Sequence, residues 1–501
     1  MAKIKRFSSG LLPSEGNCNI NEPNAMMNGR TYGLILMALL GSVMLYSQRL
    51  DLETPAVLTF EEYMGFVKKH HPYAKQATIK LDMAEASVLK ARGAFDPKVE
   101  VDYERKKFKD TEYYDLLNTT FKIPTWYGIE LKGNFEENTG AFINPQNTLP
   151  EDGLYSAGVS LSLAQGFLIN ERMASLKKAK LFTRQSEADR RRMLNELLFD
   201  ASAVYFNWME AVNEALIIRS FVENATVRLQ AVERSVEAGD KASIDITEAR
   251  IILQDRILNL EAAELKRRKA ALEVSNYLWF ESVPLELEDS VLPEAPDDNI
   301  LALSQLEVDP KDMVNALTEH PILESQRAAI EGLKVDRRLL RNKLLPRVDL
   351  QYNFLSQEYR ALDQFNTANY KALLNVSFPL FLRKERGDLK LANLKLQDAT
   401  FERVATEVSL QNKIESVYLE IASLERQVRI SEQMITDYST LVAAEERKLF
   451  LGESSLFLIN SREQKLIDAK LKQNALLAKN YASKITLFSV LGTLEQRIQA
   501  Q

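Results

Sequence analysis

Cysteine and histidine are almost absent from this sequence, which has one cysteine and three histidines in 501 residues. Cys18 stands close to the N-terminus, so disulfides and thiol chemistry are excluded from the folded body. His70, His71 and His320 are too few for a multi-histidine metal site. The chain has no phosphate-binding loop, no nucleophile paired with a base and no metal-ligand spacing. The sequence therefore predicts a protein that is not an enzyme and holds no cofactor or metal.

An excess of positive charge is lacking as well. The formal net charge is −6, with 64 Lys and Arg interspersed among 70 Asp and Glu. This pattern predicts no nucleic-acid-binding surface.

Long apolar runs are missing, and the most conspicuous one extends only from Gly33 to Leu45. A run of about thirteen residues is too short to span a bilayer and is typical of the apolar core of a secretory signal peptide. Residues 1–47 are therefore predicted to be an N-terminal extension and signal peptide, cleaved near Ser47 or Gln48; a buried anchor helix is the alternative. Because Cys18 precedes the run, it cannot be a lipoprotein cysteine. The mature chain is expected to be exported.

Glycine and proline are missing from two long stretches, 167–238 and 240–283, on either side of Gly239. Apolar residues upstream alternate in steps of three and four, and downstream they recur at every seventh position: Ile244, Ile251, Leu258, Leu265, Leu272 and Trp279. A 3.5-residue period predicts helices that supercoil against neighbouring helices. At ~1.5 Å per residue, the upstream helix would be on the order of 100 Å long. We predict a long antiparallel helical hairpin over 171–281 with its tip at Gly239.

The chain also repeats itself. His71-Pro72 recurs as His320-Pro321, and Gly239 recurs as Gly452. Two further stretches without Gly or Pro, 388–451 and 453–491, predict a second helical hairpin. These recurrences indicate a duplication. The predicted parts are repeat one over 48–283, a proline-containing connector over 284–310, repeat two over 311–493 with its hairpin over 388–491, and a C-terminal tail over 494–501.

Between the helices, apolar and polar residues alternate with period two, which is typical of strands. One strand pair is predicted in each repeat, flanking an insertion at 106–153 in repeat one and covering 347–380 in repeat two. The insertion holds a further candidate strand, Gly128 to Phe135, after the turn signal Pro124-Thr125. An ordinary half-buried soluble sheet is the alternative interpretation.

Two strands per repeat give four strands per chain, too few to close a barrel. A sheet with open edges is not tolerated in lipid, whereas three chains would supply twelve strands and close one. The sequence therefore predicts a mainly α protein with a small membrane β-barrel shared between chains.

The order of these elements resembles that of the TolC-type outer-membrane efflux protein family. A helix opening with LTFEEYMGFVKKHHP leads to a strand pair, a long helix, the tip EAGDKASIDITEAR and a return helix, and a second copy carries the tip FLGESSLFLINSRE. The resemblance covers nearly all of the mature chain. It implies a homotrimeric channel-tunnel in which a twelve-stranded β-barrel in outer-membrane lipid continues into a twelve-helix α-barrel in the periplasm.

The same resemblance implies the function and the partners. The protein would export small molecules or polypeptides as the exit duct of a tripartite efflux pump or a type I secretion system. A periplasmic adaptor (a membrane fusion protein) and an inner-membrane pump or ABC transporter would be its partners. The exported substrate is not predicted.

The resemblance also assigns candidate site residues at the helix tips. The predicted adaptor-docking residues are Gly239, Asp240, Asp245, Ala249, Arg250, Gly452 and Glu453. Gly239 is expected to adopt a positive φ and Asp245 to cap the return helix, and a purely structural role for both is the alternative. At the pore entrance, where some family members carry aspartates, this chain has Leu458 and Ser461, so no acidic ring is expected there.

Two other classes of protein stay open. One is an exported coiled-coil scaffold without a channel. The other is an enzyme with a helical insert, which needs a buried polar cluster that the sequence does not display. The pair His70-His71 is interpreted as a helix-end feature rather than a ligand pair, because adjacent side chains on a helix point in different directions.

Overall fold

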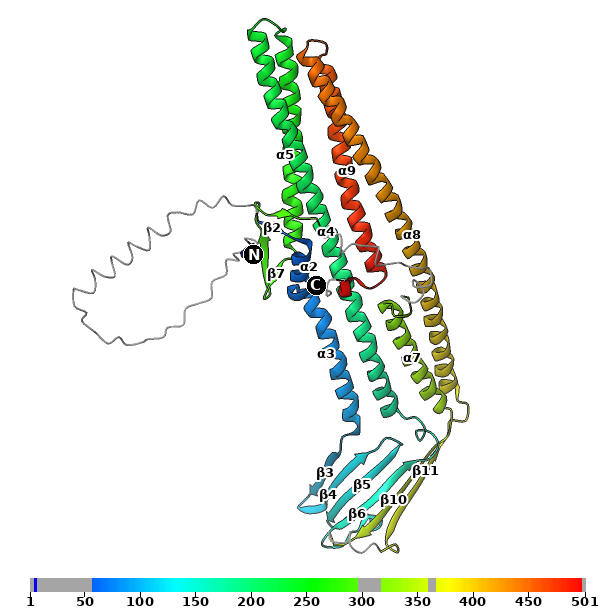
Figure 1. The fold of residues 1–501 in the computed structure, drawn as a ribbon. Coiled ribbons are helices and arrows are strands. Elements are labelled where there is room, and N and C mark those ends of the chain that lie inside the picture. Colours follow the sequence, from blue (N-terminus) through cyan, green and yellow to red (C-terminus); the bar gives the residue numbers. More distant parts are fainter. Residues whose placement is uncertain (1–3, 7–55, 296–316, 359–365, 498–501) are drawn as a thin grey trace, which may run out of the picture.

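The computed structural model describes residues 4–6, 56–295, 317–358 and 366–497. Long helices run side by side along the molecule, and a twisted sheet lies at one end (Figure 1). Most of the predicted signal-peptide segment and the second part of the predicted connector lie outside the described residues. No helix within the described residues combines the length and the hydropathy needed to cross a membrane.

Four long helices form two antiparallel hairpins. Helices α4 (Glu171–Glu237) and α5 (Ile244–Ser275) form the first, and α8 (Arg383–Phe450) and α9 (Leu456–Val490) form the second. Helix α5 ends six residues before the expected position 281, because Asn276 is its C-cap and the chain then enters strand β7 (Trp279–Phe280).

The four long helices lie side by side in one layer, which is called the helical wall below, and shorter helices extend this layer toward the sheet. They are α2 (Phe60–His70), α3 (Pro72–Arg92) and α7 (Pro321–Asn342), and a last short helix, α10 (Leu494–Arg497), lies near the C-terminus. Near the sheet the packed neighbours follow the order α3, α4, α7, α8, and toward the tips they follow the order α5, α4, α9, α8 (Figure 1). Each level of the wall is therefore four helices wide.

The largest apolar core lies at mid-height, where α4 meets α2 and the end of α5. Tyr205, Phe206 and Trp208 of α4 are buried there against Phe60 and Tyr63 of α2. The hydroxyl oxygen of Tyr205 lies 2.8 and 2.7 Å from the backbone oxygens of Leu58 and Glu294, within reach of its single proton, and it accepts the backbone N–H of Glu294 at 3.1 Å. This core holds the connector after the first repeat against the side of α4.

Histidine caps begin two of the helices that lead to the sheet. The Nδ1 atoms of His71 and His320 accept the backbone N–H groups of Tyr73 and Ile322, each at 3.2 Å, and proline follows in both cases. The interpretation of His71 as a helix-end residue is confirmed. Since Nδ1 of His320 accepts a hydrogen bond, its Nε2–H donates to the Val490 carbonyl at 3.0 Å.

This cap gives a pH-dependent contribution to stability. Burial lowers the pKa of His320 below its ordinary 6.5. The neutral cap is therefore fully stabilising above pH 6.5, and this stability is lost as the pH falls from 6.5 toward the folded-state pKa. We expect His320→Asn, which keeps a capping oxygen but does not titrate, to flatten the acid limb of the melting temperature against pH. An unchanged acid limb in this variant would contradict the assignment.

The main sheet has six strands in the order β11-β10-β6-β5-β4-β3, all antiparallel. Their bounds are β3 (Lys98–Phe108), β4 (Thr111–Pro124), β5 (Ile129–Thr139), β6 (Leu154–Ser162), β10 (Arg347–Ser356) and β11 (Tyr370–Ser377). The expectation of four strands per chain is wrong, because the insertion forms the complete hairpin β4–β5 within the sheet. Lys109 and Asp110, both with positive φ, make the two-residue turn from β3 into β4.

The remaining short strands of the described residues form two small sheets. Strand β2 (Val57–Leu58) pairs in parallel with β9 (Leu292–Pro293), and β8 (Val283–Leu287) pairs with β7 and with β1 (Ile4–Arg6). These strands lie beside the mid-height core (Figure 1).

Candidate functional site

The tip of the first hairpin is a glycine turn with exposed polar neighbours. Gly239 has a φ of +83°, and Asp240 donates its backbone N–H to Ser235, which closes the helix end. The expected cap at Asp245 is wrong: Ser243 is the N-cap of α5, and Asp245 lies in the first turn, where its charge favours the helix dipole.

The tip of the second hairpin repeats this backbone turn with apolar side chains. Gly452 has a φ of +77°, and Ser455 is the N-cap of α9, accepting the backbone N–H of Leu458 at 3.3 Å. Glu453 and Ser461 are exposed. Apolar side chains are also exposed here: Phe450 is 90% accessible and Leu458 is 43% accessible, with Leu451 and Phe457 beside them.

The two tips pack against each other through small and branched side chains. Ala249 of α5 is only 5% exposed and lies in a cluster with Val232 of α4 and Leu456 of α9. Ala249 is therefore part of this contact, whereas its neighbour Arg250 is exposed to solvent. Of the predicted docking residues, Asp240, Arg250 and Glu453 have exposed side chains at the tips.

A buried ion cluster joins the two hairpins below the tips. Glu463 of α9 is 1% exposed and receives two hydrogen bonds from Arg228 of α4, at 2.9 and 3.1 Å. Arg256 of α5 donates to the same carboxylate at 2.8 Å, and Glu446 of α8 lies 3.7 Å from Arg228. Burial lowers the pKa of Arg256. Three helices thus meet at one carboxylate, and the fourth contributes at the rim.

Apolar side chains line both outer edges of the helical wall. The heptad residues of α5 from Ile244 to Leu272 are 53–69% exposed, because the parallel row Ala249, Arg256, Ala263, Ala270 faces the rest of the chain instead. Helix α8, at the opposite edge, exposes its own row, which includes Leu391, Leu394, Phe401, Val408, Leu419, Ile430 and Leu441.

The sheet has one apolar and one polar face. Residues on the apolar face pair across all six strands, as in the row Val99, Phe121, Gly133, Ala157, Phe354, Tyr370. The next row falls on the polar face: Lys98, Lys122, Lys132, Gly158, Asn353, Lys371. Alternation of this kind is typical of a sheet with lipid on one side and water on the other. The four lysines, which the sequence analysis did not single out, share this face with acidic residues, and Lys122 forms an ion pair with Glu100 of β3.

Comparison with known proteins assigns the chain. Residues 313–493 match the family model described as outer membrane efflux protein. The pyoverdine export outer membrane protein OpmQ of Pseudomonas aeruginosa is 22% identical over 348 residues, covering 68% of this chain and 70% of that protein. Residues 313–493 belong to the outer membrane efflux protein family.

Solved structures show the same fold. The Campylobacter jejuni outer membrane channel CmeC has a TM-score of 0.60 at 14% identity, covering 96% of this chain and 94% of that one. The Neisseria gonorrhoeae outer membrane channel MtrE has a TM-score of 0.61 at 12% identity, covering 87% and 89%. The family is one of transport proteins rather than enzymes, and this chain is an outer-membrane protein that extends into the periplasm.

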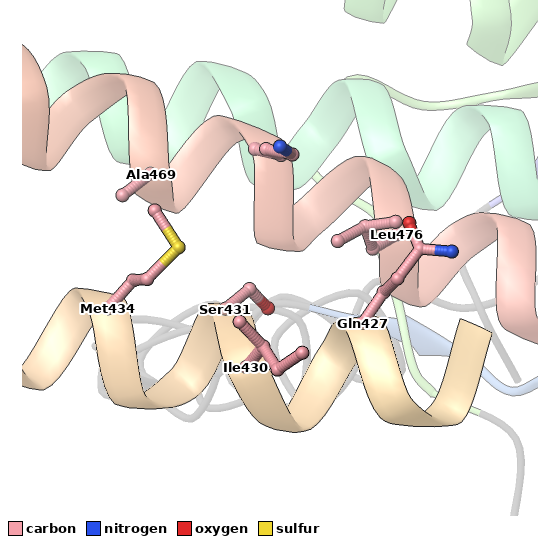
Figure 2. A pocket seen from close by; sticks show the side chains of 7 residues that line it. Gln427, Ile430, Ser431, Met434, Ala469 and Leu476 are labelled. Carbon is pink, nitrogen blue, oxygen red and sulfur yellow. The ribbon is translucent and has the colours of Figure 1, made fainter. Parts of the chain in front are cut away.

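A small cavity lies between α8 and α9 (Figure 2). Ile430, Ser431 and Met434 of α8 face Ala469 and Leu476 of α9 around a volume of about 90 Å³. Drug-sized ligands occupy pockets of roughly 300–1,000 Å³, so this cavity does not hold a transported solute. Within the described residues, no group of three or more His, Cys, Asp and Glu is placed to bind a metal ion.

The glycines at the two helix tips allow a test of the turns. A Cβ at Gly239 or Gly452 meets no atom within 4 Å, so a substitution there costs backbone strain alone. We expect Val at either position to destabilise its tip locally by about 1–3 kcal/mol, measured as faster amide exchange around the turn. Gly387→Val in α8 is the matched control, since that glycine is equally open but has no positive φ. Equal exchange in tip and control variants would contradict the prediction.

Proposed function

We propose that three copies of this chain form a closed duct through the outer membrane and the periplasm, which serves as the exit channel of a tripartite efflux pump. The observation that carries the proposal concerns the part of the chain that the structure describes, in which both the row of helices and the sheet have edges without a partner. Strands β3 and β11 have a free edge on the two sides of the sheet, and α5 and α8 carry exposed apolar rows on the same two sides. A second copy of the chain supplies the matching opposite edge.

The exposed apolar rows favour an assembly of several chains over a single chain in solution. Apolar rows of this length are rarely left exposed on a soluble monomer and mark interaction surfaces. A free strand edge is not tolerated in lipid, so a sheet with an apolar face must close on neighbouring copies. Rotational closure joins the β3 edge of one chain to the β11 edge of the next. The same rotation brings α5 and α8 of neighbouring chains together.

We further propose that the tips are the periplasmic end, where an adaptor protein docks. The exposed side chains of Asp240, Arg250 and Glu453 offer polar contacts there, and the turns at Gly239 and Gly452 hold both loops in place. The similarity to a pyoverdine export protein supports small-molecule efflux, with an inner-membrane pump as the energy source. The second candidate is polypeptide secretion by a type I system, in which an ABC transporter is the inner-membrane partner.

Fractionation and stoichiometry test the assembly. We expect the protein in the outer-membrane fraction, released only by detergent, and a molar mass of three chains by light scattering in mild detergent. A protein recovered free in the periplasm, or a monodisperse monomer in detergent, would favour the scaffold without a channel and overturn the proposal.

Site-specific photo-crosslinking tests the docking surface. A photoreactive amino acid at Asp240 or Arg250 should capture a periplasmic adaptor in cells. The same amino acid at Lys107, in the strand at the opposite end of the molecule, is the control and should capture none (Figure 1). Capture of the adaptor at Lys107 but not at the tips would reverse the proposed orientation.

A further inference from the structure

The inserted hairpin β4–β5 adds two strands to the main sheet, which is called the strand wall below, and so makes it wider. Strand β3 leads out of α3, β6 leads into α4, β10 leads out of α7, and β11 leads into α8. The lateral order of these four strands in the sheet equals the order of the four helices in the wall. Strands β4 and β5 stand between β3 and β6, and they are joined to each other at the helix end of the sheet by the turn at Thr125–Gly128, with no helix of their own.

The hairpin is a full part of the wall rather than a loop folded against it. Strand β4 pairs with β3 over the whole length of β3, and β5 pairs with β6 from Ile129 to Glu136. Its side chains keep the alternation of the sheet: Phe121 and Leu131 lie on the apolar face, and Lys122 and Lys132 lie on the polar face. Strands β4 and β5 therefore have the same lipid-facing and water-facing sides as their neighbours.

Six strands match the width of the four packed helices better than four strands would. Helices pack about 8–10 Å apart, so a row of four is about 32–40 Å wide. Strands lie about 4.8 Å apart, and a tilt of about 40° widens each to roughly 6.3 Å along the circumference, which makes six strands about 38 Å wide. Four strands would cover only about 25 Å. The inserted hairpin therefore lets the strand wall continue the helical wall without narrowing.

We propose that the inserted hairpin makes this duct a wide one: the closed assembly holds eighteen strands, six from each chain, and its strand barrel does not limit the size of the solute. This inference rests on the proposed three-chain assembly. Since barrel diameter grows roughly in proportion to strand number, the barrel is about 1.5 times as wide as one of twelve strands. The size limit then lies at the helix tips, so bulky solutes that pass the tips leave without a second constriction.

Paired cysteines test the wall in the intact protein, in a Cys18→Ser background. Leu131→Cys with Val159→Cys should form a disulfide within one chain, because these residues are directly paired between β5 and β6. Val101→Cys with Tyr155→Cys is the matched control, because these two residues lie in the same row across the sheet. Two strands separate these residues in the six-stranded sheet, about 14 Å apart and beyond disulfide reach, whereas they would be neighbours if the hairpin lay outside the wall. A disulfide in the control pair and none in the first would overturn the inference.

Two further measurements separate this inference from the proposed function. Val101→Cys combined with Cys at Ala372, Leu374 or Val376 should give a disulfide between chains, and its absence would count against the three-chain closure itself. Deleting 111–149 leaves a short loop from β3 to β6 and should narrow the barrel to about two thirds of its diameter in electron-microscopy images. An unchanged diameter in the deletion variant would show that the hairpin does not widen the wall.

Discussion

Replacing Glu463 with alanine is expected to destabilise the protein by about 3–5 kcal/mol, because it leaves one buried and one partly buried guanidinium group without their shared carboxylate. Arg228 and Arg256 both donate to Glu463, whose side chain is almost fully buried between the hairpins. Arg256 is buried as well, and the Phe221 ring lies 5.7 Å from its guanidinium. Thermal unfolding of the detergent-extracted protein measures the loss.

A surface ion pair of the same helices is the control. Glu420 of α8 and Lys479 of α9 lie 3.1 Å apart and are both exposed, so Glu420→Ala should cost only about 0–1 kcal/mol. Replacing Arg228, Arg256 and Glu463 together by apolar residues should recover much of the stability lost in the single variant. Equal melting temperatures for Glu463→Ala and Glu420→Ala would show that the cluster does not join the hairpins.

The second large effect is expected at the second tip, where Leu458→Asp should turn a poorly conducting channel into a cation-selective one. Three-fold assembly would gather three copies of the exposed apolar residues Phe450, Phe457 and Leu458 around one axis. Apolar constrictions close by excluding water, whereas a ring of carboxylates focuses a negative potential that attracts cations. We expect low conductance of the unmodified protein in planar bilayers, a severalfold increase in the variant, and block of the variant by trivalent cations from the tip side.

Leu458→Asn separates charge from hydration in this experiment. It removes the apolar surface without adding charge, so it should raise the conductance but leave the cation selectivity low. Strong block of the unmodified channel by trivalent cations would show that other acids, such as Asp240 or Glu453, form the ring.

The turns and helix ends that short sequence patterns mark were predictable from the sequence. Gly239 and Gly452 interrupt long glycine-free helical patterns, and both turns lie where the sequence places them. His71, which was interpreted as a helix-end residue, is the N-cap of α3. The helix cap at Asp245 was wrong by two residues, because Ser243, Asp245 and Thr247 are all plausible capping residues and the sequence does not rank them.

Strand β4 was missed because its sequence, TEYYDLLNTTFKIP, pairs like residues and does not alternate. Tyr113-Tyr114, Leu116-Leu117 and Thr119-Thr120 each place similar side chains on opposite faces, which conceals a period of two. The ion cluster was missed for another reason: Arg228 and Arg256 are more than 200 residues from Glu463, and each resembles an ordinary solvated helix charge. The one local sign was Arg256 at a heptad position otherwise held by Ala249, Ala263 and Ala270.

An electron-microscopy structure of the complex extracted from outer membranes tests the central proposal most directly. We predict three copies around one axis, a closed strand wall at one end, and the helix tips at Gly239 and Gly452 gathered at the other. A single chain, or an assembly in which the β3 and β11 edges stay open, would contradict the proposed duct.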